Sequence, residues 1–455
     1  MVSDVIREYR PLRECTSTGS VSYGIVQPGS HVESGVPIIR VNNINDGSLD
    51  ITSPLKVAPK IDEQHRKTRL EGGEVLLSLV GTTGQCVVAG PELKGWNVAR
   101  AIAVIKPAQG INPEWLSICL KSPAAQHYLD SRANTTVQKT LNLQDVREIP
   151  IMTVSDAEER YILEWWNTLN DKIELNRRMN ATLEGMAQAL FKSWFVDFDP
   201  VIDNALAAGN PIPDELAARA EVRRQALANG TANRDAAKPF PAAFRETEQM
   251  GWIPEGWEVS PLGDILQQRV ERVKPSPETA AIPYVPIECI SPHSLFLENT
   301  KDGIEAQSSL TKFHKGDILF GAMRPYFHKV CIAPFDGTTR TTAFVLTCKD
   351  DSDRAFGAAL VNEESTIDYA TLHSEGSTIP YAKWKNSLER MPIILPPSGL
   401  RSEFGGKVAA LLHAISPKFH QNVALTKLRD TLLPKLISGE LRIPEAEQLT
   451  EEALA

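Results

Sequence analysis

Two glycine-containing segments have residue types that could hold phosphate groups. A nucleotide-binding loop needs glycines followed by Lys and then Ser or Thr, which hold the phosphates and Mg²⁺. Residues 399–408 end in Gly405-Gly406-Lys407-Val408, so a valine stands where the hydroxyl group belongs. Residues 78–84 (SLVGTTG) resemble such a loop but no lysine follows them. Neither segment therefore predicts a nucleotide site.

The other segments that could carry catalysis also depart from the pattern that their chemistry needs. Asp197-Phe198-Asp199-Pro200 lacks the second proline and the aromatic residue of a base-methylating motif. His413 and His420 are seven residues apart, without the His-Glu-x-x-His spacing of a zinc site, and are expected to pack or face water. Gly-x-Ser-x-Gly is absent. We therefore expect no catalytic residue, metal or cofactor in this chain, with a cryptic nuclease or methyltransferase as a minor alternative.

Composition limits the class of protein. The 455 residues predict two or three domains, and the net charge of −9 argues against indiscriminate nucleic-acid binding. The six cysteines lie far apart, at positions 15, 86, 119, 289, 331 and 348, which favours reduced thiols. No apolar run is long enough for a membrane helix. A cytoplasmic protein without a membrane partner is expected.

The longest-range pattern in the sequence is an internal repeat. Gly73-Glu74-Val75-Leu76-Leu77 matches Gly316-Asp317-Ile318-Leu319-Phe320, and Ile149-Pro150-Ile151 matches Met391-Pro392-Ile393. Six such matches occur in the same order, at separations of about 240 to 250 residues. A repeat of this length predicts two copies of one domain rather than a solenoid. Short apolar runs broken by Gly, Pro and Asn predict β-strands in both copies.

A long helix is predicted after the first copy. Ser155 can cap this helix, and Glu158 completes a capping box. Apolar residues then recur every seven positions, which is typical of a coiled-coil seam. The predicted seam residues are Ile162, Trp166, Leu169, Ile173, Asn180, Leu183, Leu190 and Trp194. Adjacent helix positions diverge by ~100°, so Trp165 and Trp166 cannot both face the seam.

A less regular helix is predicted after the second copy. Its seam residues are Phe404, Val408, Leu411, Ile415, Asn422, Leu425 and Leu432. Pro417 is expected to kink or interrupt this helix. Asn180 and Asn422 correspond across the repeat and are expected to fix the helix register. The alternative is that an imperfect heptad phase leaves both asparagines facing water.

These patterns together predict an α+β protein. Two similar mixed α/β domains are expected, separated by two long antiparallel coiled-coil helices and related by a pseudo-two-fold repeat. The predicted parts are a first domain (1–153), a first helix (154–196), a connector (197–250), a second domain (251–395), a second helix (396–445) and a C-terminal tail (446–455). The connector is rich in Ala and Pro and is expected to be exposed, with one short helix at 216–227.

Three segments resemble one known family, the specificity subunits of type I restriction–modification enzymes. They are residues 175–201 (LNRRMNATLEGMAQALFKSWFVDFDPV), 251–264 (GWIPEGWEVSPLGD) and 427–443 (KLRDTLLPKLISGELRI). The resemblance spans essentially the whole chain. It implies two target-recognition domains that each read one half of a bipartite DNA sequence, with the helices setting the gap. It also implies docking of two methyltransferase subunits, joined by restriction subunits, with S-adenosylmethionine, ATP and Mg²⁺ held by those partners.

The resemblance implies DNA-reading loops in both copies, and residue chemistry selects candidates within them. Arg and Lys suit guanine, Asn and Gln suit adenine, and small hydroxyl groups suit either. In the first copy the candidates are Arg40, Asn42, Asn43, Ser78, Thr82, Thr83, Gln85 and Arg100, with Lys67 and Arg69 for phosphates. In the second they are Arg324, Tyr326, His328, Lys329, Arg340, Thr342, Lys383 and Lys385. The alternative for each single cation is a solvated surface side chain.

A second class of function remains open at this stage. A structural adaptor whose duplicated β-rich domains bind proteins would show the same repeat and the same lack of catalytic motifs. Such an adaptor would have no preference for any DNA sequence, whereas a specificity subunit would show one in the presence of its methyltransferase. The double-stranded DNA partner is therefore the point on which the two hypotheses differ.

Overall fold

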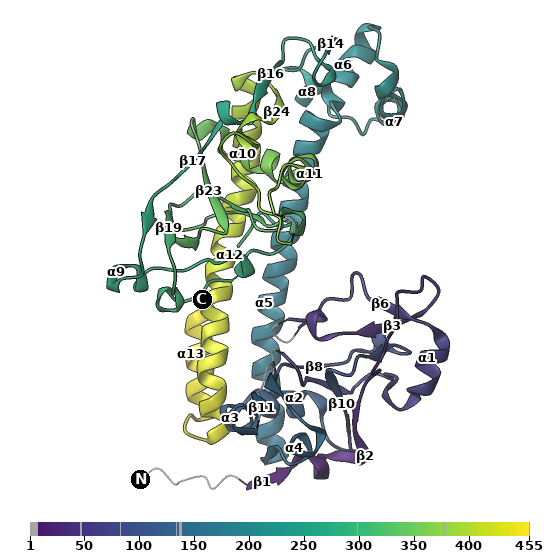
Figure 1. Ribbon diagram of the computed structural model, residues 1–455, viewed down its shortest axis with the longest axis vertical. Helices are drawn as coiled ribbons and strands as arrows, with labels where there is room; N and C mark the ends of the chain where they lie inside the picture. The colour runs from purple at the N-terminus through teal and green to yellow at the C-terminus, as the bar shows by residue number, and fades with distance from the viewer. Residues whose placement is uncertain are drawn as a thin grey trace. The chain divides into compact units, whose positions relative to one another are not determined.

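A computed structural model describes residues 8–45, 48–81, 83–132, 134–135, 139–297, 299–376 and 378–454 (Figure 1). The chain divides into two compact units. Unit 1 comprises residues 1–172 together with 424–455, and unit 2 comprises residues 173–423. Two long helices, α5 (Asp156–Phe191) and α12 (Ser398–Ser438), contribute residues to both units. The mixture of sheets and helices confirms the predicted α+β class.

Unit 1 is built on a four-stranded antiparallel sheet with the strand order β2-β10-β7-β8. Its strands are β2 (Thr16–Tyr23), β7 (Val75–Ser78), β8 (Cys86–Val88) and β10 (Ile102–Pro107). All four residues of β7 are buried, which explains its continuous apolar sequence. Helix α2 (Pro113–Lys121), capped by the side chain of Asn112, packs against β7 and β8.

Smaller elements complete the β-rich part of unit 1. A second sheet joins β6 (Leu55–Val57), β3 (Val36–Ile39) and β9 (Asn97–Val98), and β3 and β9 are parallel. β1 (Glu8–Pro11) pairs with β13 (Pro150–Thr153), which joins the two ends of this part. The other elements are β4 (Ile44–Asn45) with β5 (Ser48–Leu49), β11 (Asn134–Thr135) with β12 (Lys139–Thr140), α1 (Pro59–Gln64), α3 (Pro123–Arg132) and α4 (Leu143–Arg147).

Unit 2 repeats this topology. Its main sheet has the order β17-β23-β20-β21, made by β17 (Leu266–Gln268), β20 (Ile318–Gly321), β21 (Val330–Ile332) and β23 (Ala343–Cys348). β16 (Glu258–Pro261) pairs with β24 (Pro392–Leu395), as β1 pairs with β13. β18 (Arg272–Val273), β19 (Leu310–Phe313) and β22 (Gly337–Arg340) form a three-stranded sheet. The helices are α9 (Pro277–Ala280), α10 (Arg354–Val361) and α11 (Glu364–Leu372).

The turn that precedes β7 and β20 shows the duplication in atomic detail. Gly73 and Gly316 have φ angles of +91° and +89°, in the left-handed region that favours glycine. The amide of Gly73 donates to the carbonyl of Ala89 at 2.7 Å, and that of Gly316 donates to Ala333 at 2.8 Å. The matching sequences therefore reflect one shared backbone geometry.

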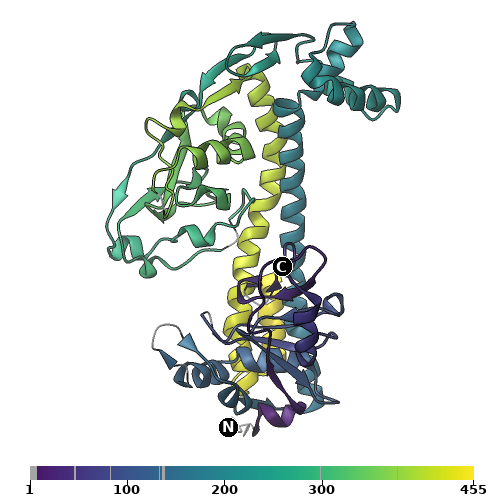
Figure 2. The same ribbon diagram turned by 45° about the vertical axis from the view of Figure 1, so that its right-hand side comes forward.

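Within each unit, segments of α5 and α12 run side by side in opposite directions (Figures 1 and 2). In unit 1, Nη1 of Arg429 donates to Oδ1 of Asn170 at 2.8 Å. In unit 2, Nδ2 of Asn176 donates to Oε1 of Gln421 at 2.9 Å and to Oδ1 of Asn422 at 2.8 Å. Asn176 is 3% exposed, so these hydrogen bonds form a buried polar layer between the helices.

The predicted seam residues all lie on the covered faces of the helices. Nine of them are buried: Ile162, Leu169, Ile173, Trp194, Phe404, Val408, Ile415, Leu425 and Leu432. Trp166, Asn180, Leu183, Leu190, Leu411 and Asn422 are partly buried. Trp165 points instead to α13 (Ile443–Leu454), where its Nε1 donates to Oγ1 of Thr450 at 2.7 Å. Helix α13 thus includes the described residues of the segment assigned above to the C-terminal tail.

The expectation that Pro417 interrupts the second helix is wrong, because α12 continues through this position. Proline removes one backbone hydrogen bond, but the helix on both sides is held by burial of Ile415 and Phe419. Pro417 itself is exposed, which leaves its ring clear of the packed face. Tertiary packing therefore outweighs the local cost of the proline.

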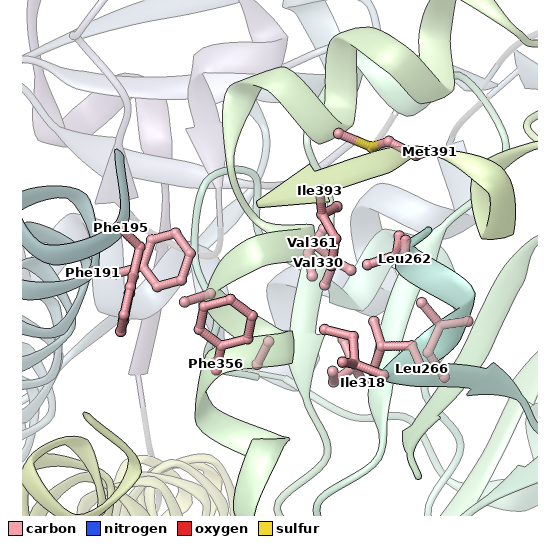
Figure 3. Packing of buried hydrophobic residues seen from close by; sticks show 14 of the residues in the cluster. Phe191, Phe195, Leu262, Leu266, Ile318, Val330, Phe356, Val361, Met391 and Ile393 are labelled. Carbon is pink, nitrogen blue, oxygen red and sulfur yellow. The ribbon is translucent and has the colours of Figure 1, made fainter. Parts of the chain in front are cut away.

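The end of α5 enters an aromatic core of unit 2. Phe191 lies 5.6 Å from Phe356 and 5.7 Å from Phe404, measured between ring centroids. Figure 3 shows Phe191 and Phe195 facing Phe356, with aliphatic residues of the β-rich part beyond it. A π-helical turn at Lys192–Val196 places Trp194 and Phe195 in the same core. Such contacts attach the helix to the domain that follows it in sequence.

The connector contains the short helix predicted at 216–227, and it also contains elements that the sequence did not predict. It contains α6 (Asp199–Ala208), α7 (Ala217–Ala228), α8 (Arg234–Ala237) and a hairpin of β14 (Phe244–Thr247) with β15 (Gly251–Pro254). Asp199 and Asp203 on α6 are 3% and 4% exposed and pair with Arg219 and Arg223 on α7. The ion pairs join α6 to α7, which an Ala-rich and Pro-rich composition did not reveal.

Candidate nucleic-acid interface

Three loops of unit 1 meet where β7 ends. The amide of Leu79 donates to the carbonyl of Ala101 at 2.8 Å, and the amide of Leu141 donates to Leu79 at 3.0 Å. An isolated bridge joins Val80 to Thr140. The segment after β7 is thereby held between the residues before β10 and the residues after β12.

The candidates of this region divide into surface and interior side chains. Arg100 is exposed beside the junction, and Thr83 and Gln85 are partly exposed in the turn between β7 and β8. Ser78 is fully buried, and its Oγ accepts a hydrogen bond from the amide of Gln85 at 3.0 Å. Ser78 therefore shapes the turn and does not reach its surface. Thr82 lies outside the described residues.

The segment after β3 also contains both surface and interior side chains among its candidates. Asn42 is exposed, whereas Asn43 is 6% exposed and is used internally. Oδ1 of Asn43 accepts from the amide of Arg40 at 2.9 Å, and its Nδ2 donates to the carbonyl of Asp50 at 3.0 Å. The Nε of Arg40 is buried and has no hydrogen-bond partner among the described residues. Asn43 thus braces the turn that presents Arg40 and Asn42.

Arg69 and Lys67 lie in a segment that is held by a buried network of polar side chains. Nδ2 of Asn97 donates to Oδ1 of Asp62 at 2.8 Å, and Oγ1 of Thr68 donates to Oδ1 of Asn97 at 2.8 Å. Arg69 pairs with Asp62 and with Glu63, and these hydrogen bonds raise the pKa of its guanidinium. Lys67 is exposed. The network fixes residues 65–69 beside β9. The first residue of β9, Asn97, lies three residues before Arg100.

Three loops of unit 2 meet where β20 ends, in the same way. The amide of Ala322 donates to the carbonyl of Thr342 at 2.9 Å, and the amide of Ala382 donates to Ala322 at 2.9 Å. The amide of Arg324 donates to the carbonyl of Pro380 at 2.8 Å. These bonds bring together the strand-exit turn at 322–329, the residues before β23 and the loop at 375–385, which carry all eight second-copy candidates.

Two of these candidates brace the turn from inside. His328 is 7% exposed, and its Nε2 lies 2.8 Å from the carbonyl oxygen of Asn362. Burial lowers the pKa of His328, and the nearby His293 lowers it further. Nζ of Lys329 donates to the carbonyl of Ile287 at 2.9 Å, and burial lowers the pKa of this amine. Neither side chain is free to reach a base edge in this conformation.

The remaining candidates of unit 2 lie at the surface or just beneath it. Arg340, Tyr326 and Lys385 are exposed. Lys383 is exposed and pairs with Glu375 at 2.6 Å. Thr342 is partly buried, and its Oγ1 has no hydrogen-bond partner among the described residues. Arg340 precedes β23 as Arg100 precedes β10, so each unit has one exposed arginine beside its strand-exit junction.

The structure adds residues that sequence reasoning missed. Phe327 is 46% exposed next to Tyr326, and the Tyr-Phe pair between Pro325 and His328 was a visible signal. The role of Asn97 had no such signal, because its partners Asp62 and Thr68 are brought to it only by the fold. Asn97 lies three residues before the exposed Arg100, but it is fully buried.

Two classes of reactive group, metal ligands and thiols, can be located in the described part of the chain. It contains no group of three or more His, Cys, Asp or Glu side chains that could hold a metal ion. All six cysteines are free, and burial raises the pKa of each thiol, for example to about 11 for Cys289 and about 12 for Cys348. Thiols with raised pKa values are poor nucleophiles. None of the described helices is long and apolar enough to cross a membrane.

Comparison with known proteins finds similarity to one class of protein. Residues 30–185 match the type I restriction modification DNA specificity domain. The chain is 26% identical to the specificity subunit of the type I restriction enzyme HindI from Haemophilus influenzae, over 82% of this chain and 88% of that one. It is 26% identical to the MjaIX specificity subunit from Methanocaldococcus jannaschii, over 82% and 78%. Over these ranges the chain is similar to specificity subunits of type I restriction enzymes.

Among solved structures, the S subunit of a type I restriction–modification system from M. genitalium is similar at 13% identity and a TM-score of 0.44. That comparison covers 96% of this chain and 97% of the other. The HsdS subunit from Thermoanaerobacter tengcongensis is similar at 16% identity and a TM-score of 0.34, over 96% and 97%.

Proposed function

We propose that this chain is the non-catalytic subunit that selects the DNA sequence for a type I restriction–modification complex. The observation that carries the proposal is the duplicated junction of three loops, at the end of β7 in unit 1 and of β20 in unit 2. The junction of unit 1 presents Arg100, Thr83 and Gln85, and that of unit 2 presents Arg340 and Lys385. These are the residue types that read base edges in the major groove.

The parts of the complex follow from this role. Residues 1–153 and 251–395 each read one half of a bipartite target, and the helices at 154–196 and 396–445 dock two methyltransferase subunits. Restriction subunits join the full complex. The net charge of −9 supports a division of labour in which partner chains supply much of the phosphate contact. S-adenosylmethionine, ATP and Mg²⁺ act in those partners.

The two exposed arginines give the sharpest test of this function. The chain is purified with its methyltransferase, and methylated positions are mapped on genomic DNA for the wild type, Arg100→Ala and Arg340→Ala. A bidentate arginine–guanine contact is worth ~1–3 kcal/mol, or about 5- to 150-fold in discrimination. Arg100→Ala is expected to relax one half of the motif and Arg340→Ala the other half.

A matched control is Arg224→Ala on α7, since Arg224 is also exposed and pairs only with Glu221 in the same helix. It should leave the motif unchanged. Relaxation of the same half by both arginine variants would contradict the assignment of one half to each domain. Methylation that does not depend on this chain at all would instead favour the protein-binding adaptor.

A further inference from the structure

The turn after β20 carries two neighbouring aromatic side chains on the surface of unit 2. Tyr326 is 49% exposed and Phe327 is 46% exposed, with ring centroids 4.9 Å apart. Among the residues that the structure describes, Phe327 is the only phenylalanine exposed to this extent. A paired exposed aromatic surface of this kind indicates a binding role rather than a contribution to folding.

The turn holds both rings in place from either side. Arg324 and His328 have φ angles of +52° and +51°, in a region that side chains other than glycine rarely adopt. The amide of Phe327 donates to Arg324 at 3.0 Å, and the amide of His328 donates to Pro325 at 2.8 Å. Pro325 is buried, and His328 is anchored to Asn362. The strain at two positions is maintained by these contacts, which is typical of a functional turn.

The surroundings of the two rings suit a polyanion. Arg324 lies in the same turn, directly before Pro325, and its Nε is buried without an acceptor among the described residues. Arg340 and Lys385 are exposed on the two loops that are hydrogen-bonded to the same strand exit. Lys383 also lies there but is neutralised by Glu375. The aromatic pair therefore stands within a group of cations that could contact phosphates.

The equivalent turn of unit 1 has no aromatic residue. Between Ser78 and Gln85 the chain carries Leu, Val, two threonines and two glycines. Gly81 and Gly84 have φ angles of +80° and +86°. The Leu79 side chain is buried, and Val80 and Thr83 are only partly exposed. The two turns share a backbone topology, but only the turn of unit 2 carries large aromatic side chains.

We infer that Tyr326 and Phe327 form a wedge that inserts into a base step of the half-site read by unit 2 and unstacks it. The inference rests on the proposed function, since it names how one of the two domains engages its DNA. Apolar and aromatic side chains that enter a base step partly unstack it and bend the duplex. Pyrimidine–purine steps deform most easily, so the wedge favours such a step at its insertion point. The half-site read by unit 1 stays stacked.

The test uses the full chain in complex with its methyltransferase subunits and duplexes that contain the mapped motif. 2-Aminopurine, whose fluorescence rises when it is unstacked, replaces one base at a time in both half-sites. The methylated base is left out, because methyltransferases themselves take their target base out of the stack. We expect a rise at one step of the unit 2 half-site and none at other positions of either half-site.

The double variant Tyr326→Ala, Phe327→Ala is expected to abolish this rise and to weaken DNA binding by on the order of tenfold. Methylation should lose its preference at the step that the wedge enters, whereas the bases read by Arg100 and Arg340 should still be required. Val222→Ala, at a 54% exposed apolar position on α7, is the matched control and should change nothing. A rise that persists in the double variant would overturn the inference. So would loss of the methyltransferase subunit from that variant, because the pair would then be a protein contact.

The outcomes separate the wedge from the proposed function. If the wild-type complex methylates no motif in a chain-dependent way, the proposed function fails. If the wild-type complex methylates a motif in a chain-dependent way but no base step shows a rise in 2-aminopurine fluorescence, only the inference of a wedge fails.

Discussion

The buried ion pair between Asp203 on α6 and Arg223 on α7 allows a quantitative prediction. The side chain of Asp203 is 4% exposed and that of Arg223 is 17% exposed, and Nε of Arg223 donates to Oδ1 of Asp203 at 2.8 Å. A second hydrogen bond joins Nη2 to Oδ2, so the contact is bidentate. Arg223→Met leaves a buried carboxylate without its partner, at a cost of ~3–5 kcal/mol.

The double variant Asp203→Leu, Arg223→Met should lose far less, because both charges are removed and apolar side chains of similar volume replace them. Arg219 still pairs with Asp199 in this variant. Most of the loss in the single variant should therefore be recovered. Arg224→Met is the matched control, since its pair with Glu221 is more than half exposed on both sides and contributes ~0.2–1 kcal/mol.

Hydrogen exchange of the amides in α6 and α7 is the suitable assay, because it reports local opening in a chain with two units. A loss of ~3–5 kcal/mol corresponds to amide protection lower by about 150- to 4,000-fold, at tenfold for each 1.4 kcal/mol. Equal losses in the single and double variants would refute the reasoning, since the carboxylate would then not be the cause. A loss below about fivefold in Arg223→Met would show that water reaches Asp203.

Three further predictions concern the helices and the strand-exit turn. Asn176→Ala removes two buried hydrogen bonds to α12, and it should lower the free energy of unfolding of unit 2 by ~2–3 kcal/mol, measured by denaturant unfolding. An unchanged unfolding midpoint would show that the polar layer between the helices is accessible to water. Pro417→Ala restores a backbone donor in an exposed helix position and should raise amide protection around it by at least tenfold; lower protection would show that α12 needs the proline. His328 has a lowered pKa in the folded state, so its neutral form is favoured there and its contribution to stability is complete above its unfolded pKa of ~6.5. This contribution is lost as the pH falls below that value, so amide protection of the turn should drop between pH 7.5 and 5.5 in the wild type and stay level in His328→Gln. A drop that persists in the variant would show that His328 is not the cause of the pH dependence.

Periodic features of this protein could be predicted from the sequence, and features that depend on tertiary contacts could not. The seam from Ile162 to Trp194 was visible because burial of one helix face imposes a seven-residue period. The packing of α6 against α7 in the connector could not be predicted, because the pairing of Asp203 with Arg223 has no periodic signature. Pro417 was judged by local helix propensity, which packing on both sides overrides.

The candidate site shows the same limit at the level of single side chains. Residue type selected the loops that the fold brings together, since the bonds of Ala322 to Thr342 and Ala382 join all three loops of unit 2. Residue type could not separate a side chain on the surface from one that braces the turn. Ser78 and His328 have the chemistry of base-reading residues, but both are buried by contacts that form only after folding.

Unit 1 is assembled from two segments that are far apart in sequence, and this has a consequence during protein synthesis. The Nε1 of Trp165 reaches its partner Thr450 across 285 residues. At ~5–20 residues per second, a ribosome needs about 15 to 60 s to make that stretch. Unit 2 is one continuous segment and can fold within this interval. During the same interval Ile162, Leu169 and the other apolar residues of their helix face remain exposed, because the C-terminal segment that buries them has not yet been made. The nascent chain therefore exposes this apolar helix face until residues 424–454 have been made.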